Sequence, residues 1–302
     1  MDCDNHHHQE LFWALRGAGA GNFGVVTRLV FGTVPAPQVT NFHVTWPPAR
    51  VASLIKAWQG WAPLAPDELA ASLKVTAAGE VEQPASVDVY GALLGTGSDA
   101  TELLDELVMR AGADPVLAWV GQLSFAETRR FWANLPVGEA AVGNGPHARS
   151  AEHPYLVVKS EFFTRPLPDA AATALVENFV QGRPAGESRE LDFIPWGGAY
   201  NRVLPDATAF VHRDARYQLK HAAVVDSRAS TAATHAAHRW VTRSWALVHP
   251  WGSGRVFPNF PDPDLEDWGP AYYGTNFDRL VRIKARYDPA GLFHFHQSLP
   301  AG

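Results

Sequence analysis

Residues 268–300 read WGPAYYGTNFDRLVRIKARYDPAGLFHFHQSLP. Apolar side chains recur three or four residues apart in this stretch, at Phe277, Leu280, Ile283 and Tyr287. Thr275 and Asp278 have the spacing of a capping box, with Asp in place of the usual Glu. The sequence Asp-Pro-Ala-Gly at 288–291 disfavours continuation of a helix. The pattern therefore predicts an amphipathic helix of about three turns that starts near Thr275.

Polar and aromatic side chains gather at the predicted start of this helix. They are Tyr272, Tyr273 and Asn276. A capped helix start is rigid, so we expect these groups to be held in fixed directions. They are the first candidates for functional residues.

The same stretch contains motifs of a known family. AYYGTNFDRL, then K-x-x-Y-D-P and F-x-F-x-Q-S-L-P, all within residues 271–300, resemble the C-terminal signature of the berberine-bridge-enzyme-like FAD-linked oxidases. His296 departs from the family pattern, which has Asn or Glu at that position. The resemblance implies that Tyr272 is the base that takes a proton from substrate, that Tyr273 supports it, and that Asn276 helps to place the flavin ring.

A glycine-rich segment lies near the other end of the chain, in ELFWALRGAGAGNFGVVT at residues 10–27. It predicts a short buried helix over 11–15, a tight glycine passage and a strand over 25–31. Gly19-x-Gly21-x-x-Gly24 formally matches the dinucleotide fingerprint. That fingerprint needs a strand before it, a helix after it and an acidic residue about twenty positions later. Here the order is reversed and no acidic residue occurs between Glu10 and Asp67, so the pattern disfavours a Rossmann fold.

The glycine segment also resembles the D-L-F-W-A-L-R-G-G-G-G-N-F-G-V-V-T stretch of the same oxidase family, with Glu10, Ala18 and Ala20 as departures. The resemblance implies that FAD is bound by residues of this segment and of the C-terminal helix start. These residues are Gly21, Asn22, Phe23, Gly24, Val25 and Asn276.

In the family this segment lies late in the FAD-binding domain. The phosphate-binding glycine loop, and the His and sometimes Cys that bond covalently to the flavin, precede it. Neither Cys3 nor the histidines at 6–8 stand in a matching context. The chain therefore resembles the C-terminal two-thirds of such an enzyme, and we expect it to bind FAD weakly.

The remaining patterns predict an α+β fold. Pro35-Ala36-Pro37 suggests a domain boundary, which divides the chain into the end of an FAD-binding domain (1–37), a substrate-binding domain (38–258) and a segment that returns to the FAD-binding domain (259–302). Strands are expected at 40–46, 70–77, 86–94, 155–163, 207–212 and 217–225, and helices at 51–61, 99–111, 170–180 and 230–247. The resemblance implies a largely antiparallel sheet backed by helices, plus the remnant of a PCMH-type FAD-binding domain formed by the two chain ends.

Composition narrows the class of protein. The chain has 302 residues, 46% hydrophobic and 19% charged, with a net charge of −6 and a single cysteine. No run of eighteen apolar residues and no basic motif occurs, so neither a membrane span nor nucleic-acid binding is expected. A small-molecule substrate is the expected partner. No feature of the sequence indicates the oligomeric state or the cellular compartment, and a cytoplasmic location is only the default expectation.

Metal binding is not expected. The histidines at 6–8 are adjacent and point in different directions, and His235 and His238 have no third ligand nearby in sequence. Two hypotheses for function follow from the resemblance. One is an FAD-dependent oxidase or dehydrogenase that acts on an alcohol, a sugar or a C–H bond of a secondary metabolite; the other is a truncated, inactive fragment or binding module.

Overall fold

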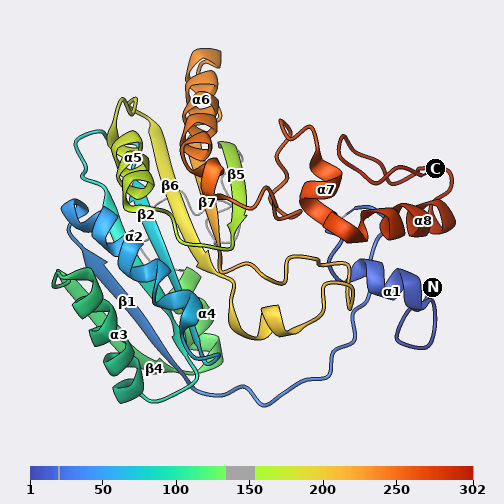
Figure 1. The fold of residues 1–302 in the computed structure, drawn as a ribbon, viewed down its shortest axis with the longest axis horizontal. Coiled ribbons are helices and arrows are strands. Elements are labelled where there is room, and N and C mark those ends of the chain that lie inside the picture. Colours follow the sequence, from blue (N-terminus) through green and yellow to red (C-terminus); the bar gives the residue numbers. More distant parts are fainter. Residues whose placement is uncertain (20, 134–153, 302) are drawn as a thin grey trace.

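The protein is described here by a computed structural model that covers residues 1–19, 21–133 and 154–301. Its centre is a seven-stranded antiparallel sheet with the strand order β4-β1-β3-β2-β6-β7-β5 (Figure 1). The strands are β1 (Val39–Trp46), β2 (Leu69–Ala77), β3 (Ser86–Leu93), β4 (Leu117–Leu123), β5 (Tyr155–Phe163), β6 (Glu187–Pro195) and β7 (Tyr217–Val225). The α-helices are α1 (Gln9–Leu15), α2 (Val51–Gln59), α3 (Gly97–Ala111), α4 (Phe125–Ala133), α5 (Asp169–Val180), α6 (Thr231–Val248), α7 (Trp268–Tyr273) and α8 (Phe277–Tyr287).

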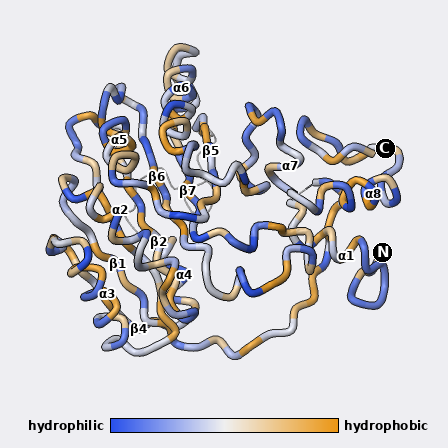
Figure 2. The backbone as a smooth tube through the Cα atoms, in the orientation of Figure 1, coloured by the Kyte–Doolittle hydropathy of each residue, from blue (hydrophilic) through white to orange (hydrophobic). Residues whose placement is uncertain are grey.

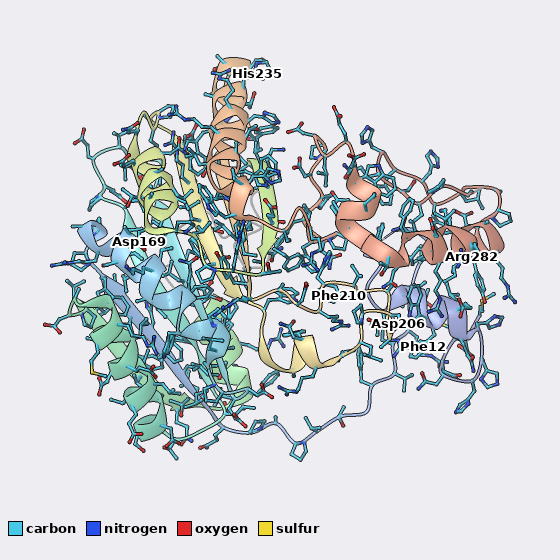
Figure 3. The ribbon with its side chains drawn as sticks, viewed as in Figure 1. Phe12, Asp169, Asp206, Phe210, His235 and Arg282 are labelled. Carbon is cyan, nitrogen blue, oxygen red and sulfur yellow. The ribbon has the colours of Figure 1, made fainter. Side chains whose placement is uncertain are left out.

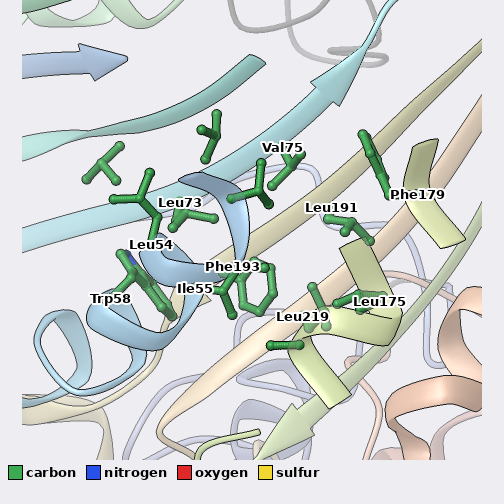
Figure 4. Close-up of a cluster of buried hydrophobic side chains, with 14 of the residues drawn as sticks. Leu54, Ile55, Trp58, Leu73, Val75, Leu175, Phe179, Leu191, Phe193 and Leu219 are labelled. Atoms are coloured by element: carbon green, nitrogen blue, oxygen red, sulfur yellow. The ribbon is translucent and has the colours of Figure 1, made fainter. Parts of the chain in front are cut away.

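One face of the sheet is apolar and is covered by α2, α3, α5 and α6 (Figure 1). Successive side chains of a strand point to opposite faces, so alternate residues such as Leu73 and Val75 on β2 share this side. Leu54 and Trp58 of α2 and Leu175 of α5 pack onto them (Figure 4). This layer is the main hydrophobic core of the chain.

The two chain ends form a second, smaller group, in which α1 lies beside α7 and α8 (Figure 1). Its buried residues form a separate hydrophobic cluster, called here the chain-end cluster: Trp13, Ala14, Ala18, Phe23, Ala209, Val256, Ala271, Tyr272, Tyr273, Leu280, Ile283 and Leu299. Residues far apart in sequence therefore share one core. Phe23 and Tyr273, which come from opposite ends, both belong to it.

The predicted α+β class with an antiparallel sheet backed by helices is confirmed. The strands predicted at 40–46, 70–77, 86–94, 155–163 and 217–225 are present, as are all the predicted helices. The sequence patterns assigned no element to β4, α4 or β6. Strand β6 was not predicted because its sequence, ESRELDFIP, is rich in charged residues, which are usually exposed but are buried in this strand.

Two predicted strands are wrong. Residues 207–212 form an irregular loop, and residues 25–31 form an extended chain without a pairing strand. In the second segment Val30 is 87% exposed and Phe31 is 73% exposed. A strand requires a hydrogen-bonded neighbour, and none of the described residues provides one. The segment runs along the lower edge of the molecule with hydrophobic stretches in view (Figure 2).

The predicted capping box is also wrong. Helix α8 begins at Phe277, after a 3-10 turn at Gly274–Asn276, and its N-cap residue Asn276 makes no capping bond with its side chain. Tyr272 and Tyr273 lie in the preceding helix α7 rather than at the start of α8. The predicted end of α8 is confirmed, because Asp288 is the C-cap residue. Within the described ranges, no helix has the length and apolar character needed to cross a bilayer.

The exposed apolar segment leads to a first prediction. Replacing Val30 and Phe31 by Ser together should reduce binding of an apolar dye such as ANS and slow aggregation, because both side chains are largely in water. Met109→Ser on α3, where a 75% exposed Met stands alone on a helix, should change neither quantity. Dye fluorescence that is the same in the double variant and the parent chain would contradict this reading of the segment.

Candidate functional site

A buried lysine joins the two chain ends. The ammonium Nζ of Lys284, a residue only 1% exposed, donates to the carbonyl of Asn22 at 2.7 Å, to Asp288 Oδ2 at 2.6 Å and to the carbonyl of Phe293 at 2.5 Å. The hydrogen bond from Lys284 holds the pKa of Asp288 below its usual range. All three ammonium protons therefore have acceptors. This accounts for the K-x-x-Y-D-P motif as a structural joint.

Asn22 makes the second link between the ends. Its Oδ1 accepts the backbone N–H of Leu299 at 3.0 Å, and its Nδ2 donates to the carbonyl of Ala18 at 3.1 Å and to the hydroxyl of Tyr273 at 3.4 Å. The Tyr273 hydroxyl donates to the same carbonyl at 2.9 Å. Burial raises the pKa of Tyr273 to about 12. The two side chains thus bind each other and the backbone.

Tyr272 belongs to a closed ring of hydrogen bonds. Its hydroxyl accepts the backbone N–H of Asp262 at 2.9 Å and donates to Gln297 Oε1 at 2.9 Å. Gln297 Nε2 in turn donates to the carbonyl of Asp262 at 2.6 Å. Burial, together with the Asp262 carboxylate, raises the pKa of Tyr272. A base role needs a lowered pKa, and this environment does not provide one.

The side chain of Asn276 binds the loop that contains Pro205 and Thr208. Its Nδ2 donates to the carbonyls of Pro205 at 2.8 Å and Thr208 at 3.2 Å. The same loop meets α1, because Trp13 Nε1 donates to the carbonyl of Asp206 at 2.7 Å (Figure 3). Asn276 is therefore turned toward the loop rather than toward open space.

The glycine segment lies beside these residues, and Gly17 is needed for close approach of the backbone at Phe210. Gly17 has φ 135°, and a Cβ there would lie 2.2 Å from the backbone N of Phe210. Phe23 is buried in the chain-end cluster, whereas Val25 is 79% exposed. The structure thus brings Gly21, Asn22 and Phe23 to the C-terminal motifs and leaves Val25 in solvent.

A charged link connects the chain-end group to the sheet. Lys159 of β5 is 5% exposed, and its Nζ contacts Asp262 Oδ1 at 2.7 Å and Asp264 Oδ2 at 2.8 Å. Asp264 also accepts His238 Nε2 of α6 at 3.0 Å. Because Asp262 also binds Tyr272 and Gln297, the sheet is connected directly to the hydrogen-bonded ring.

The second face of the sheet carries charged side chains that sequence reasoning missed. Cross-strand pairs place Asp88, Lys74, Asp192 and Lys220 in one row across β3, β2, β6 and β7, which we call the polar rung. They alternate in sign along the row. The neighbouring Glu190 accepts Lys220 Nζ at 2.6 Å. The alternation of polar and apolar residues in Glu190-Leu191-Asp192 and Gln218-Leu219-Lys220 could have predicted strands with one charged face. Charged residues in a strand are usually taken to be exposed, so their burial was not predicted.

The environment of the polar rung shifts the pKa values of its members. Burial raises the pKa of Asp192 against the attraction of Lys220 and Lys74. For Lys220, burial alone would lower the pKa, but Asp192 and Glu190 outweigh it and the pKa is raised. Asp192 Oδ1 and Gln218 Oε1 are buried acceptors without a hydrogen-bond partner. The polar face therefore has free acceptors for donors of a bound molecule.

His212 lies in an aromatic cage and is fully buried. Its ring centroid is 4.6 Å from that of Phe162 and 5.3 Å from that of Phe210, and neither ring nitrogen has a hydrogen-bond partner. Burial, with a smaller effect of Arg255, lowers the pKa of His212 to about 4. This histidine is neutral at pH 7. In the described ranges, no group of three or more potential ligands is placed to hold a metal ion.

Comparison with known proteins agrees with these motifs. The family model described as "Berberine and berberine like" matches residues 256–300. The chain is 31% identical to the uncharacterized FAD-linked oxidoreductase YgaK of Bacillus subtilis (strain 168), over 99% of this chain and 60% of that protein. It is 30% identical to YvdP, another uncharacterized FAD-linked oxidoreductase of that organism, over 99% of this chain and 62% of that protein.

The chain is thus similar to FAD-linked oxidoreductases along nearly its whole length, and its C-terminal segment matches the berberine-like family model. It spans 60% and 62% of the length of those two curated relatives. The fold agrees: the berberine bridge enzyme from Eschscholzia californica has a TM-score of 0.81 at 22% identity, over 97% of this chain and 61% of that one. BBE-like 28 from Arabidopsis thaliana has a TM-score of 0.82 at 24% identity, over 97% of this chain and 63% of that one.

The Lys284 joint gives a second prediction. Lys284→Met removes the only charge that neutralises buried Asp288 in the joint, so the free energy of unfolding should fall by about 3–5 kcal/mol in urea denaturation. Lys56→Met is the matched control, because its ion pair with Asp169 is exposed and worth about 1 kcal/mol or less. Equal losses in the two variants would show that the Lys284 joint does not hold the chain ends together.

The buried histidines give a third prediction. Burial lowers the pKa of His212 from 6.5 to about 4 and that of His221 to about 3, so the unfolded chain takes up protons first as the pH falls. The free energy of unfolding should be fully retained above about pH 6.5 and decline from there toward pH 4. His212→Phe keeps a ring in the cage without a titrating group, so thermal unfolding should depend less steeply on pH. An unchanged slope would refute the assignment of His212.

Proposed function

We propose that this chain is the substrate-binding part of an FAD-dependent oxidoreductase that removes a hydride from a C–H bond of an alcohol, a sugar or a secondary metabolite. The observation that carries the proposal is the similarity to an FAD-linked oxidoreductase along 99% of the chain. The relatives' names specify a flavin reaction and no substrate. The domain division at residues 37 and 258 is part of the same proposal, supported by the main core, whose buried residues all lie between Phe42 and Val248, although Ala209 and Val256 pack into the chain-end cluster.

FAD would accept the two electrons and the hydrogen from substrate carbon. The polar side chains that the resemblance assigns to FAD fit poorly in this structure, since Asn22 and Asn276 use their polar groups on the protein itself. The open surface is the backbone at Gly24, where a Cβ would meet nothing within 4 Å, and at exposed Val25. This limited fit supports the expectation that the chain alone binds FAD weakly.

The polar face is the surface we assign to the substrate. This face carries the polar rung, and Asp192 Oδ1 and Gln218 Oε1 lack donors. Buried acceptors without partners are costly, so a bound molecule with hydroxyl or amine donors would relieve that cost. The charged rung also fixes the positions of these acceptors, because Lys220 is paired with both Glu190 and Asp192.

We assign proton transfer to Tyr272, on the condition that its hydroxyl is deprotonated first. Its hydroxyl already donates to Gln297 and its pKa is raised, so it must lose its proton before it can take one from substrate. Asp262, whose backbone belongs to this ring, pairs through its carboxylate with Lys159, so a charged group lies close to the Tyr272 hydroxyl. Tyr273 is the less suitable candidate, since both its hydroxyl contacts lie within the chain-end cluster.

The fourth prediction tests the proposed reaction and its base. The chain is fused behind the part of YgaK that it does not cover, and flavin absorbance and stopped-flow flavin reduction are measured with a panel of alcohols and sugars. Tyr272→Phe should slow reduction about a hundredfold or more, the usual worth of a general base, while the flavin stays bound. Tyr273→Phe should slow it much less.

The possible outcomes separate the two claims. A fusion that binds flavin but is reduced by no member of a broad panel would count against the oxidoreductase and favour a binding module. Reduction that is unaffected by Tyr272→Phe would retain the oxidoreductase and remove Tyr272 as its base. If only Tyr273→Phe slowed flavin reduction, Tyr273 rather than Tyr272 would be the base.

A further inference from the structure

A pocket lies on the side of the sheet that the helices α5 and α6 cover. Its volume is about 480 Å³, and it opens between α5, α6 and the start of β6. The residues used below are Asn178, Glu187, Arg189, Arg239, Trp240 and Arg243. None of them belongs to the chain-end cluster, and Glu187 and Arg189 point to the face of β6 opposite Glu190 and Asp192. The pocket is thus distinct from the surface assigned to the substrate.

Two arginines give the pocket a positive charge. Arg239 and Arg243 are exposed, stand four residues apart on α6 and both line the pocket. No ion pair to either of them is found among the described residues. Like charges at this helix spacing repel each other. In a chain with a net charge of −6, two unpaired arginines facing one pocket favour a bound anion.

The floor of the pocket adds one free donor and one free acceptor. Arg189 is already neutralised, because its Nε contacts Glu187 Oε1 at 2.7 Å and its guanidinium lies 4.6 Å from the centre of the Trp240 ring. Asn178 Nδ2 is buried and has no acceptor, and Glu187 Oε2 is buried and has no donor. Asn178 is 6% exposed and Glu187 is 2% exposed. Such groups cost free energy until a bound molecule satisfies them.

We propose that this pocket binds a phosphate group, either free or on a small molecule. The guanidinium groups of Arg239 and Arg243 match the oxygens of an oxyanion, and Asn178 Nδ2 donates to another oxygen. Glu187 Oε2 would repel a fully ionised anion. Hydrogen phosphate keeps an O–H at neutral pH, which donates to this carboxylate oxygen. Sulfate has no such proton and satisfies the arginines alone.

The test is calorimetric titration of the whole chain with sodium phosphate at constant ionic strength, repeated with sodium sulfate. Phosphate should bind saturably and more tightly than sulfate. Arg239→Ala with Arg243→Ala should weaken phosphate binding about tenfold or more, because it removes the charge-assisted hydrogen bonds. Arg282→Ala with Arg286→Ala is the matched control, since these arginines are also exposed and four residues apart on α8. Arg282 is labelled in Figure 3.

Each other outcome overturns the proposal in a defined way. No saturable heat with the parent chain, or unchanged binding in the Arg239/Arg243 variant, removes the site. An equal loss in the Arg282/Arg286 variant shows that net charge alone attracts the anion. Sulfate that binds as tightly as phosphate removes the role of Glu187. Circular dichroism of both double variants confirms that each is folded, so a lost signal reports the pocket.

Discussion

The need to neutralise one buried ammonium group organises the joined ends of this chain. Lys284 lies in the interior, where an unpaired charge is very costly, and its three acceptors come from Asn22, Asp288 and Phe293. Two of these lie just after α8 and one lies in the glycine segment more than two hundred residues earlier. The hydrogen bonds that neutralise Lys284 therefore bring together two ends of the chain that the residues of the sheet separate in sequence.

The sheet shows the same physical constraint in a different form. Its helix-covered face is apolar, whereas the opposite face buries Asp88, Lys74, Asp192 and Lys220 in a row of alternating sign. Cross-strand neighbours of opposite charge offset the free-energy cost of burying these groups. A slip of the strand register by one residue would place like charges or apolar groups opposite each other. The polar rung thus fixes the strand register as well as providing a surface for a ligand.

Patterns in the sequence predicted the parts of the fold whose cause is local. The period of apolar residues found α2, α3, α5, α6 and α8, and alternation found five of the strands. Strand β6 was missed because its charges are buried by partners on β2 and β7 that are distant in sequence. The strand expected at 25–31 failed for the converse reason: its residues favour a strand, but no described residue pairs with it.

The sequence by itself determined the motif residues and the similarity that they carry, because the spacing of groups such as Asn22, Lys284 and Asp288 is a property of the chain. Only the tertiary structure decided what those groups contact. It turned Tyr272 toward Asp262 and Gln297, raised its pKa by burial, and assembled the polar rung from four strands. Hydrogen-bond partners and burial depend on residues brought together by folding, so spacing along the chain carries no record of them.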